Sequence, residues 1–314
     1  MMSTLLLFAA LSWVPLPAQT AGGSVETSQL EVRVEPGQIW RQNVQFESAV
    51  RHPDGSLSRW VFDYKLRLRC MSMTDGAFDV EGRFVDWLLR LESDHCRYEW
   101  FQGKFHLTGE KAPELGSVAG EACRDLLYAW SAGLRGAKLR FTLHPDGRIT
   151  GMTGIDNLHE KVGIALSQLG DETPAALIQF FGVGGLSRAD CALQFALSCP
   201  RPIGEVKPGK EWTHQCEVKG LTSKLCQVSR RFQFSGTSQD RSSEIAQIAL
   251  LPDFRHKSPE GKWVSVDPVN GPQLPNRLEI LLDSGLIHRM ELNLQRQLPG
   301  GGSAGFILHS KNAQ

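Results

Sequence analysis

The stretch "RWVFDYKLRLRC" (residues 59–70) decides the fold class of this chain. Its even-numbered positions are apolar or aromatic, from Trp60, Phe62 and Tyr64 to Cys70, and its odd-numbered positions are mostly charged. An alternation with a period of two is typical of a β-strand that buries one face and exposes the other to water. The stretch therefore predicts one long strand of an antiparallel sheet.

The residues that follow continue this sheet. Asp75-Gly76 predicts a tight hairpin turn, because Asp-Gly readily takes the positive φ angles that such turns need. In the next run the apolar phase holds to Phe84 and then switches to Trp87, which predicts a β-bulge near Val85–Asp86. Strands of this length favour a strongly curved antiparallel sheet.

The middle of the chain, about 117–199, has a helical pattern. After a first helix and a hairpin with the turn "HPDG" (144–147), three helix starts follow at Thr153, Thr173 and Ser187. Beyond this segment the strand pattern resumes. The patterns predict an α+β fold in which long curved antiparallel sheets pack on a helical middle segment.

A short sequence motif occurs twice in the chain. "RVEPGQIW" (33–40) and "EVKPGKEW" (205–212) share Val, Pro, Gly and Trp at the same spacing, and each opens a strand-rich half. A second repeated motif, Gly-x-Ile-x-x-Met, occurs at 147–152 and 285–290. We expect an internal duplication of a strand-rich unit. The alternative is that Pro-Gly turns before strands are common in any β protein.

The N-terminus predicts export. Residues 5–14 form an apolar run that is too short to span a bilayer, and small residues follow it. We expect a signal peptide over 1–21, a first β-rich unit with the helical segment over 22–202, and a second β-rich unit over 203–314. The alternative for the apolar run is a buried N-terminal helix. The mature protein is expected to be soluble, periplasmic or extracellular, with no membrane span.

The seven cysteines include no Cys-x-x-Cys pair, so redox and zinc motifs lack their basic unit. Cys216 and Cys226 flank a turn centred on Leu221, which would place them directly opposite each other on two antiparallel strands. Opposite residues lie within disulfide reach, and export would allow the bridge. The alternative is two small buried thiols on one face.

The charge balance and the motifs exclude several function classes. Lys+Arg and Asp+Glu are both 34, which argues against a generic nucleic-acid binder. The sequence contains no nucleophile-elbow motif, no phosphate-loop lysine and no histidine pair at helical spacing. We therefore expect no enzyme, no cofactor, and no catalytic, cofactor-binding or metal-ligating residue.

Aromatic residues on the predicted strands have two interpretations. They either fill the core or line a wide cavity for an apolar ligand. The residues concerned are Trp40, Trp60, Phe62, Tyr64, Trp87, Trp100 and Trp212.

The strings "LHPDGRITGMTGIDNLHEKV" (143–162) and "PRPIGEVKPGKEWTHQ" (200–215) resemble a group of bacterial exported proteins that have no assigned activity. The resemblance covers 30–300 in layout, and its specific part is 140–215. The layout also resembles the lipoprotein-carrier half-barrels of the LolA type, in which a curved antiparallel sheet wraps an apolar cavity and helices close it. This second resemblance implies an architecture and transfers no residue role.

Together these patterns predict a non-enzymatic exported binding or scaffold protein of the cell envelope that holds an apolar ligand in a sheet-lined cavity. Two alternatives stay open: a structural or protein-interaction module without a small ligand, and a hydrolase-type enzyme with an unrecognised site. A closed apolar pocket favours the first hypothesis, and an exposed apolar patch favours the second. A cleft with convergent titratable groups favours the third.

Overall fold

The computed structural model describes 27–93, 96–109, 118–171, 183–219, 225–240, 242–257, 261–265, 276–297 and 302–313. The predicted signal peptide at 1–21 and the predicted helix start at Thr173 lie outside these residues.

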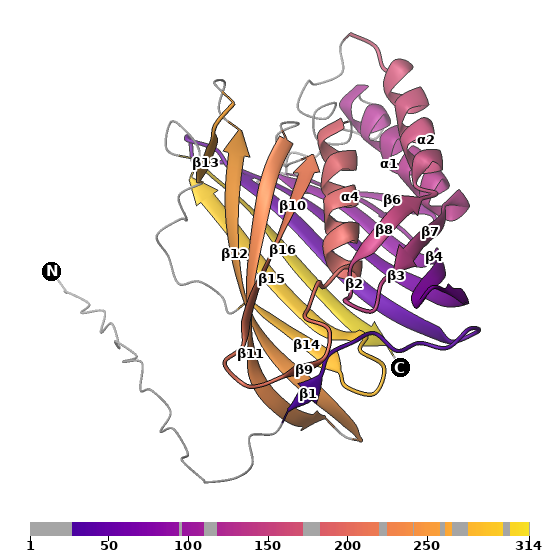
Figure 1. Cartoon of the computed structure of the whole chain (residues 1–314). Coiled ribbons are helices and arrows are strands. Elements are labelled where there is room, and N and C mark those ends of the chain that lie inside the picture. The colour runs from indigo at the N-terminus through magenta and orange to yellow at the C-terminus, as the bar shows by residue number, and fades with distance from the viewer. Residues whose placement is uncertain are drawn as a thin grey trace, which may run out of the picture.

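Most of the described chain is β-sheet, as Figure 1 shows. The strands of the first half are β1 (Ser28–Gln29), β2 (Ile39–Arg51), β3 (Leu57–Thr74), β4 (Ala77–Ser93), β5 (Arg97–Phe101), β6 (Lys104–Thr108), β7 (Lys138–Leu143) and β8 (Ile149–Thr153). Those of the second half are β9 (Glu205–Val206), β10 (Glu211–Lys219), β11 (Leu225–Asp240), β12 (Ser243–Lys257), β13 (Trp263–Ser265), β14 (Arg277–Leu281), β15 (Ile287–Gln297) and β16 (Ser303–Ala313). The described helices are α1 (Val118–Gly136), α2 (Asp156–Ser167) and α4 (Val183–Leu197).

The predicted α+β class is wrong, because the protein is mostly β. The three helices in the described part form a minority beside strands such as β3 and β4, which are 18 and 17 residues long. The segment predicted to be helical, about 117–199, also contains the β7–β8 hairpin. This hairpin pairs with β4 and belongs to the main sheet.

One antiparallel sheet runs through both halves of the chain. It contains 14 strands, and its main path is β10-β11-β12-β14-β15-β16-β2-β3-β4-β5-β6. The last strand, β16, pairs with β2 over its whole length and so joins the halves. Helix α1 lies against β4, β5 and β6, whereas α4 lies against β10 and β16. The halves therefore share one sheet, and the helices cover its apolar face.

The alternation of β3 produces the core as predicted. Trp60 and Phe62 are buried and contact Trp130 of α1, with ring centroids 5.4 and 6.0 Å apart. The predicted bulge is confirmed, because Lys65 pairs with Asp86 and the next residue, Leu66, pairs with Phe84. Val85 is the extra residue, and from Trp87 onward the odd-numbered side chains face the helices.

The first hairpins of the two halves have corresponding registers. Trp40 of β2 pairs with Leu68, and Trp212 of β10 pairs with Phe232. In each half the amide of the Pro-Gly glycine donates to the second strand, from Gly37 to Cys70 and from Gly209 to Phe234. A bulge follows one residue later in both cases, between Cys70 and Ser72 and between Phe234 and Gly236. The predicted duplication stays a prediction, and these registers agree with it.

Two segments, here called the lead-ins, precede the first long strand of each half: 27–38 before β2 and 198–210 before β10. Each packs on a turn that belongs to the other half, so the lead-ins dock crosswise. The Arg33 amide donates to Ser284 O in the β14–β15 turn (2.7 Å), and the Arg201 amide donates to Asp146 O in the β7–β8 turn (2.8 Å). Between them β1 and β9 pair antiparallel. Each lead-in therefore rests on a turn of the opposite half.

Candidate functional site

Most of the predicted aromatic residues pack against α1. Trp60, Phe62 and Tyr64 are buried, and the indole N–H of Trp87 donates to Ser131 Oγ (3.0 Å). The ring of Trp100 meets Tyr128 edge-on at 5.7 Å. Four of the predicted residues, Trp60, Phe62, Trp87 and Trp100, contact this helix, and Tyr64 packs on Phe62 and Phe84 within the same core.

Trp40 and Trp212 lie elsewhere and are half-buried. Trp212 stacks on Phe232, and its N–H donates to Pro200 O (2.8 Å). Trp40 borders a small void at the junction of the halves. The seven aromatic residues therefore do not converge on one site.

The predicted opposition of Cys216 and Cys226 is wrong. The register pairs Cys216 with Val228 and Val218 with Cys226, so the two cysteines are diagonal neighbours. Diagonal neighbours lie about 7–8 Å apart, which exceeds the usual disulfide separation. Their side chains are outside the described part, and the bridge stays a prediction. Where the side chains are described, Cys70, Cys96, Cys123 and Cys199 are free thiols.

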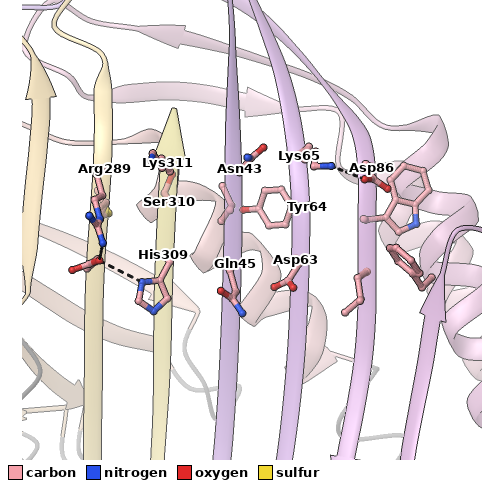
Figure 2. A pocket seen from close by; sticks show the side chains of 16 residues that line it. Asn43, Gln45, Asp63, Tyr64, Lys65, Asp86, Arg289, His309, Ser310 and Lys311 are labelled. Carbon is pink, nitrogen blue, oxygen red and sulfur yellow. Dashed lines mark hydrogen bonds and ion pairs between the residues drawn. The ribbon is translucent and has the colours of Figure 1, made fainter. Parts of the chain in front are cut away.

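A hollow of about 580 Å³ lies on the polar face of the sheet, opposite the helices (Figure 2). Residues paired directly across neighbouring strands point to the same side of a sheet. Two such rows cross β15, β16, β2, β3 and β4 side by side. The basic row is Arg289, Lys311, Asn43, Lys65 and Asp86, and the acidic row is Glu291, His309, Gln45, Asp63 and Leu88, continued by Phe101 of β5.

Most charges in the hollow are paired. Lys65 Nζ lies 2.9 Å from Asp86 Oδ2, and an Arg289 Nη2 nitrogen lies 2.5 Å from Glu291 Oε1. Within the described part of the chain, neither Lys311 nor Asp63 has an ion-pair partner. The hollow thus presents one cation and one carboxylate on adjacent rows.

Asp63 is the carboxyl group of the hollow whose pKa is raised. Burial raises the pKa of its carboxyl from 3.8 to about 6, and Arg90 and Arg59 only partly oppose this rise. Its Oδ1 atom is buried and has no hydrogen-bond partner. A carboxylate without a partner and with a raised pKa is a common feature of binding and catalytic sites.

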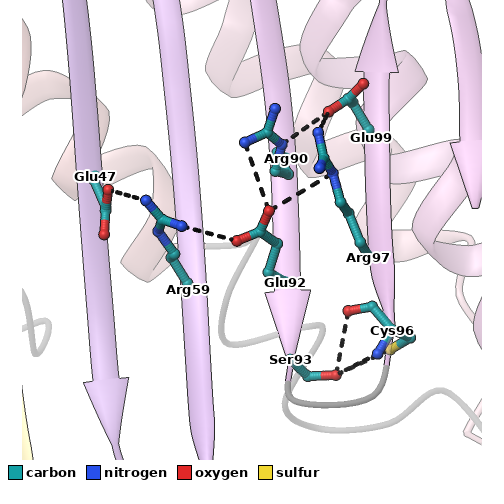
Figure 3. Close-up of polar contacts among 8 residues, drawn as sticks. All are labelled: Glu47, Arg59, Arg90, Glu92, Ser93, Cys96, Arg97 and Glu99. Carbon is teal, nitrogen blue, oxygen red and sulfur yellow. Dashed lines mark hydrogen bonds and ion pairs between the residues drawn. The ribbon is translucent and has the colours of Figure 1, made fainter. Parts of the chain in front are cut away.

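An ion-pair network, drawn in Figure 3, lies next to the acidic row on the strands β2 to β5. Arg59 bridges Glu47 (2.5 Å) and Glu92 (3.1 Å), and Arg90 bridges Glu92 (3.5 Å) and Glu99 (2.8 Å). Arg97 contacts the same two glutamates as Arg90. Because its three arginines are matched by three glutamates, the network compensates the charge of Asp63 only in part.

The charged groups of this arrangement can bind a polar ligand by ion pairs and hydrogen bonds. Ser310, the serine of the lining, is buried, and its hydroxyl accepts a hydrogen bond from Gln42 (2.6 Å). Among the described residues, no group of three metal-ligating side chains occurs. None of the described helices is long and apolar enough to cross a membrane.

Sequence reasoning missed the hollow. Its polar residues occupy the exposed phase of strands that alternate correctly, but they come from positions between 43 and 311. The available signal was the run of polar residues at that phase, in particular Asp63 on β3. Without the order of the strands, these residues could not be brought together.

No family model and no curated protein matches the chain. Among solved structures, lipovitellin matches 90% of this chain at 10% identity and a TM-score of 0.32, and the chain spans 26% of the lipovitellin chain. A protein from Bacteroides fragilis, described as exported and as having a YMCC-like fold, matches 90% of this chain and 100% of its own at 10% identity and a TM-score of 0.25. MucB in complex with MucA, from Pseudomonas aeruginosa, matches 88% of this chain and 89% of its own at 11% identity and a TM-score of 0.14.

All three TM-scores are low, so these similarities carry no inference about the function of this chain. The comparisons do not confirm the predicted resemblance to lipoprotein-carrier half-barrels of the LolA type.

Proposed function

We propose that this chain is an exported, non-enzymatic binding protein and that its polar hollow holds a small zwitterionic ligand. The supporting observation is that, among the described residues, neither Asp63 on the acidic row nor Lys311 on the adjacent basic row has an ion-pair partner. A ligand with a cationic group would compensate Asp63, and its anionic group would reach Lys311.

The spacing of the two residues suits one small molecule. Asp63 and Lys311 are two strands and one row apart, which is roughly 12 Å between Cα atoms for strands about 4.8 Å apart and a rise of about 3.3 Å per residue. The flexible lysine stem shortens the distance between the charged groups. Because Leu88 and Phe101 continue the acidic row, the cationic end of the ligand would also meet an apolar and aromatic wall.

Titration calorimetry with three probes tests this proposal. Glycerophosphoethanolamine carries both charges, ethanolamine carries only the cation, and glycerol phosphate carries only the anion. We expect the zwitterion to bind more tightly than either part, and Asp63→Asn to weaken its binding at least about tenfold, the factor that corresponds to 1.4 kcal/mol. Arg67→Met, an exposed arginine on the same face outside the hollow, is the matched control and should bind normally.

Equal binding of the zwitterion to wild type and to Asp63→Asn would contradict the proposal. Binding of a lysolipid that persists in Asp63→Asn would favour the sequence-based prediction of an apolar ligand. Turnover of any probe would favour the enzyme alternative.

A further inference from the structure

The chain between α4 and β10 carries a buried arginine at the junction of the two halves. The amides of Cys199 and Arg201 donate to Gly147 O (2.9 Å) and Asp146 O (2.8 Å), which fixes the backbone on the β7–β8 turn. Only 6% of Arg201 is exposed. Its Nη2 group donates to Gly285 O (2.5 Å) in the β14–β15 turn.

The guanidinium of Arg201 is only partly satisfied. Nε and Nη1 are buried and have no hydrogen-bond partner. The carboxylate of Asp146 attracts this guanidinium, but that carboxylate is bound by Arg148, whose Nε lies 2.5 Å from Asp146 Oδ2. Arginine stays protonated in proteins, and a buried charge without a partner is costly. A compensating group is therefore expected.

A void of about 30 Å³ adjoins this guanidinium. Its walls come from both halves and are mostly apolar: Val32, Trp40, Leu68, Phe141, Leu143, Leu197, Leu286 and Ile287, with Gln42, Cys199 and Arg201 as polar groups. The amide nitrogen of Gln42 is already engaged with Ala196 O and Ser310 Oγ. A void of this size admits about two water-sized particles. Among the described residues that line it, none has an acidic side chain.

We infer that this void is a binding site for a small monovalent anion such as chloride, held by the guanidinium of Arg201. The anion would supply the negative charge that the surrounding side chains lack, and it would sit between the lead-in of the second half and the turns of both halves. Binding there would stabilise the junction. This site is separate from the polar hollow, which lies on the other face of the sheet.

Thermal unfolding in sodium chloride and in sodium gluconate at the same ionic strength tests the inference, because gluconate is too large for the void. We expect the unfolding midpoint of wild type to rise saturably with chloride and not with gluconate. Arg201→Met should lose this chloride-specific rise. Arg67→Met, which removes an exposed arginine, should keep it.

If Arg201→Met does not fold, crystals of the wild type grown in bromide test the anion site beside Arg201. An anomalous bromide peak in the void beside Arg201, together with the chloride-specific rise, would support the site. Equal midpoints in both salts would overturn it, and a bromide peak would then indicate binding at crystal concentration only. A water peak without bromide in the void would also overturn it.

Discussion

Two glycines should be unusually intolerant of alanine, because the crosswise docking of the lead-ins leaves no room for a side chain. Gly147 has φ +74°, and a Cβ there would lie 2.1 Å from Cys199 O. Gly285 has φ +67°, and a Cβ there would lie 2.0 Å from Glu31 O. Both carbonyls belong to backbone, so the overlap cannot be relieved by rotating a side chain.

The expected loss has two parts. A left-handed backbone costs an L-residue about 1–2 kcal/mol. Displacing the docked lead-in adds about 1–3 kcal/mol, the usual range for overpacking. We therefore expect Gly147→Ala and Gly285→Ala each to lower the free energy of unfolding by about 2–5 kcal/mol. Gly151, with φ +63° and nothing within 4 Å, is the control and should lose only the first part.

Urea unfolding followed by tryptophan fluorescence measures these losses. The midpoint should fall most for Gly147→Ala and Gly285→Ala, with an unchanged dependence on urea. If Gly151→Ala is destabilised as much as the other two, the lead-ins do not dock on these turns as described.

Three further perturbations probe the core, the paired tryptophans and the hollow. Trp130→Ala removes the ring that Trp60 contacts and should cost about 3–5 kcal/mol in urea unfolding; a loss below about 1 kcal/mol would show that α1 does not hold the sheet. Trp40→Ala and Trp212→Ala should give similar losses of about 2–3 kcal/mol, because both rings are half-buried at corresponding positions, and a large difference would argue against duplication. The pKa of Asp63 is about 6 in the folded protein, above its ordinary value of 3.8, so the folded protein holds this proton more tightly than the unfolded chain does. As the pH rises from about 4 to about 7, the free energy of unfolding of the wild type should therefore fall by about 1–2 kcal/mol, a value reduced because the side chain is partly exposed. Asp63→Asn should lack this fall when the free energies of unfolding are compared at about pH 4 and about pH 7. The same pH dependence in both proteins would refute the raised pKa of Asp63.

Local patterns predicted the strands and failed on their assembly. The alternation in β3 and the phase switch at Val85 depend on neighbours in sequence, and both are confirmed. The β7–β8 hairpin was recognised, but its pairing with β4 depends on a contact across about 60 residues, so the share of sheet was underestimated. The register at Cys216 was shifted because the length of a turn does not fix its centre.

The candidate site could be predicted only in its parts. Asp63 was visible as a polar residue on an alternating strand. Its neighbour Gln45 is set by the pairing of β2 with β3, and His309 joins the same row only through the pairing of β16 with β2. Arg201 had no sequence signal at all, since its burial follows from the crosswise docking of the two halves. Contacts between strands that are distant in sequence decide both features.

Native mass spectrometry of the protein purified from its own host, in wild-type and Asp63→Asn forms, tests the central claim most directly. We predict a small zwitterionic molecule bound to wild type at one copy per chain and absent from Asp63→Asn. A copurified apolar lipid retained equally by both forms, or no ligand in either, would contradict the account.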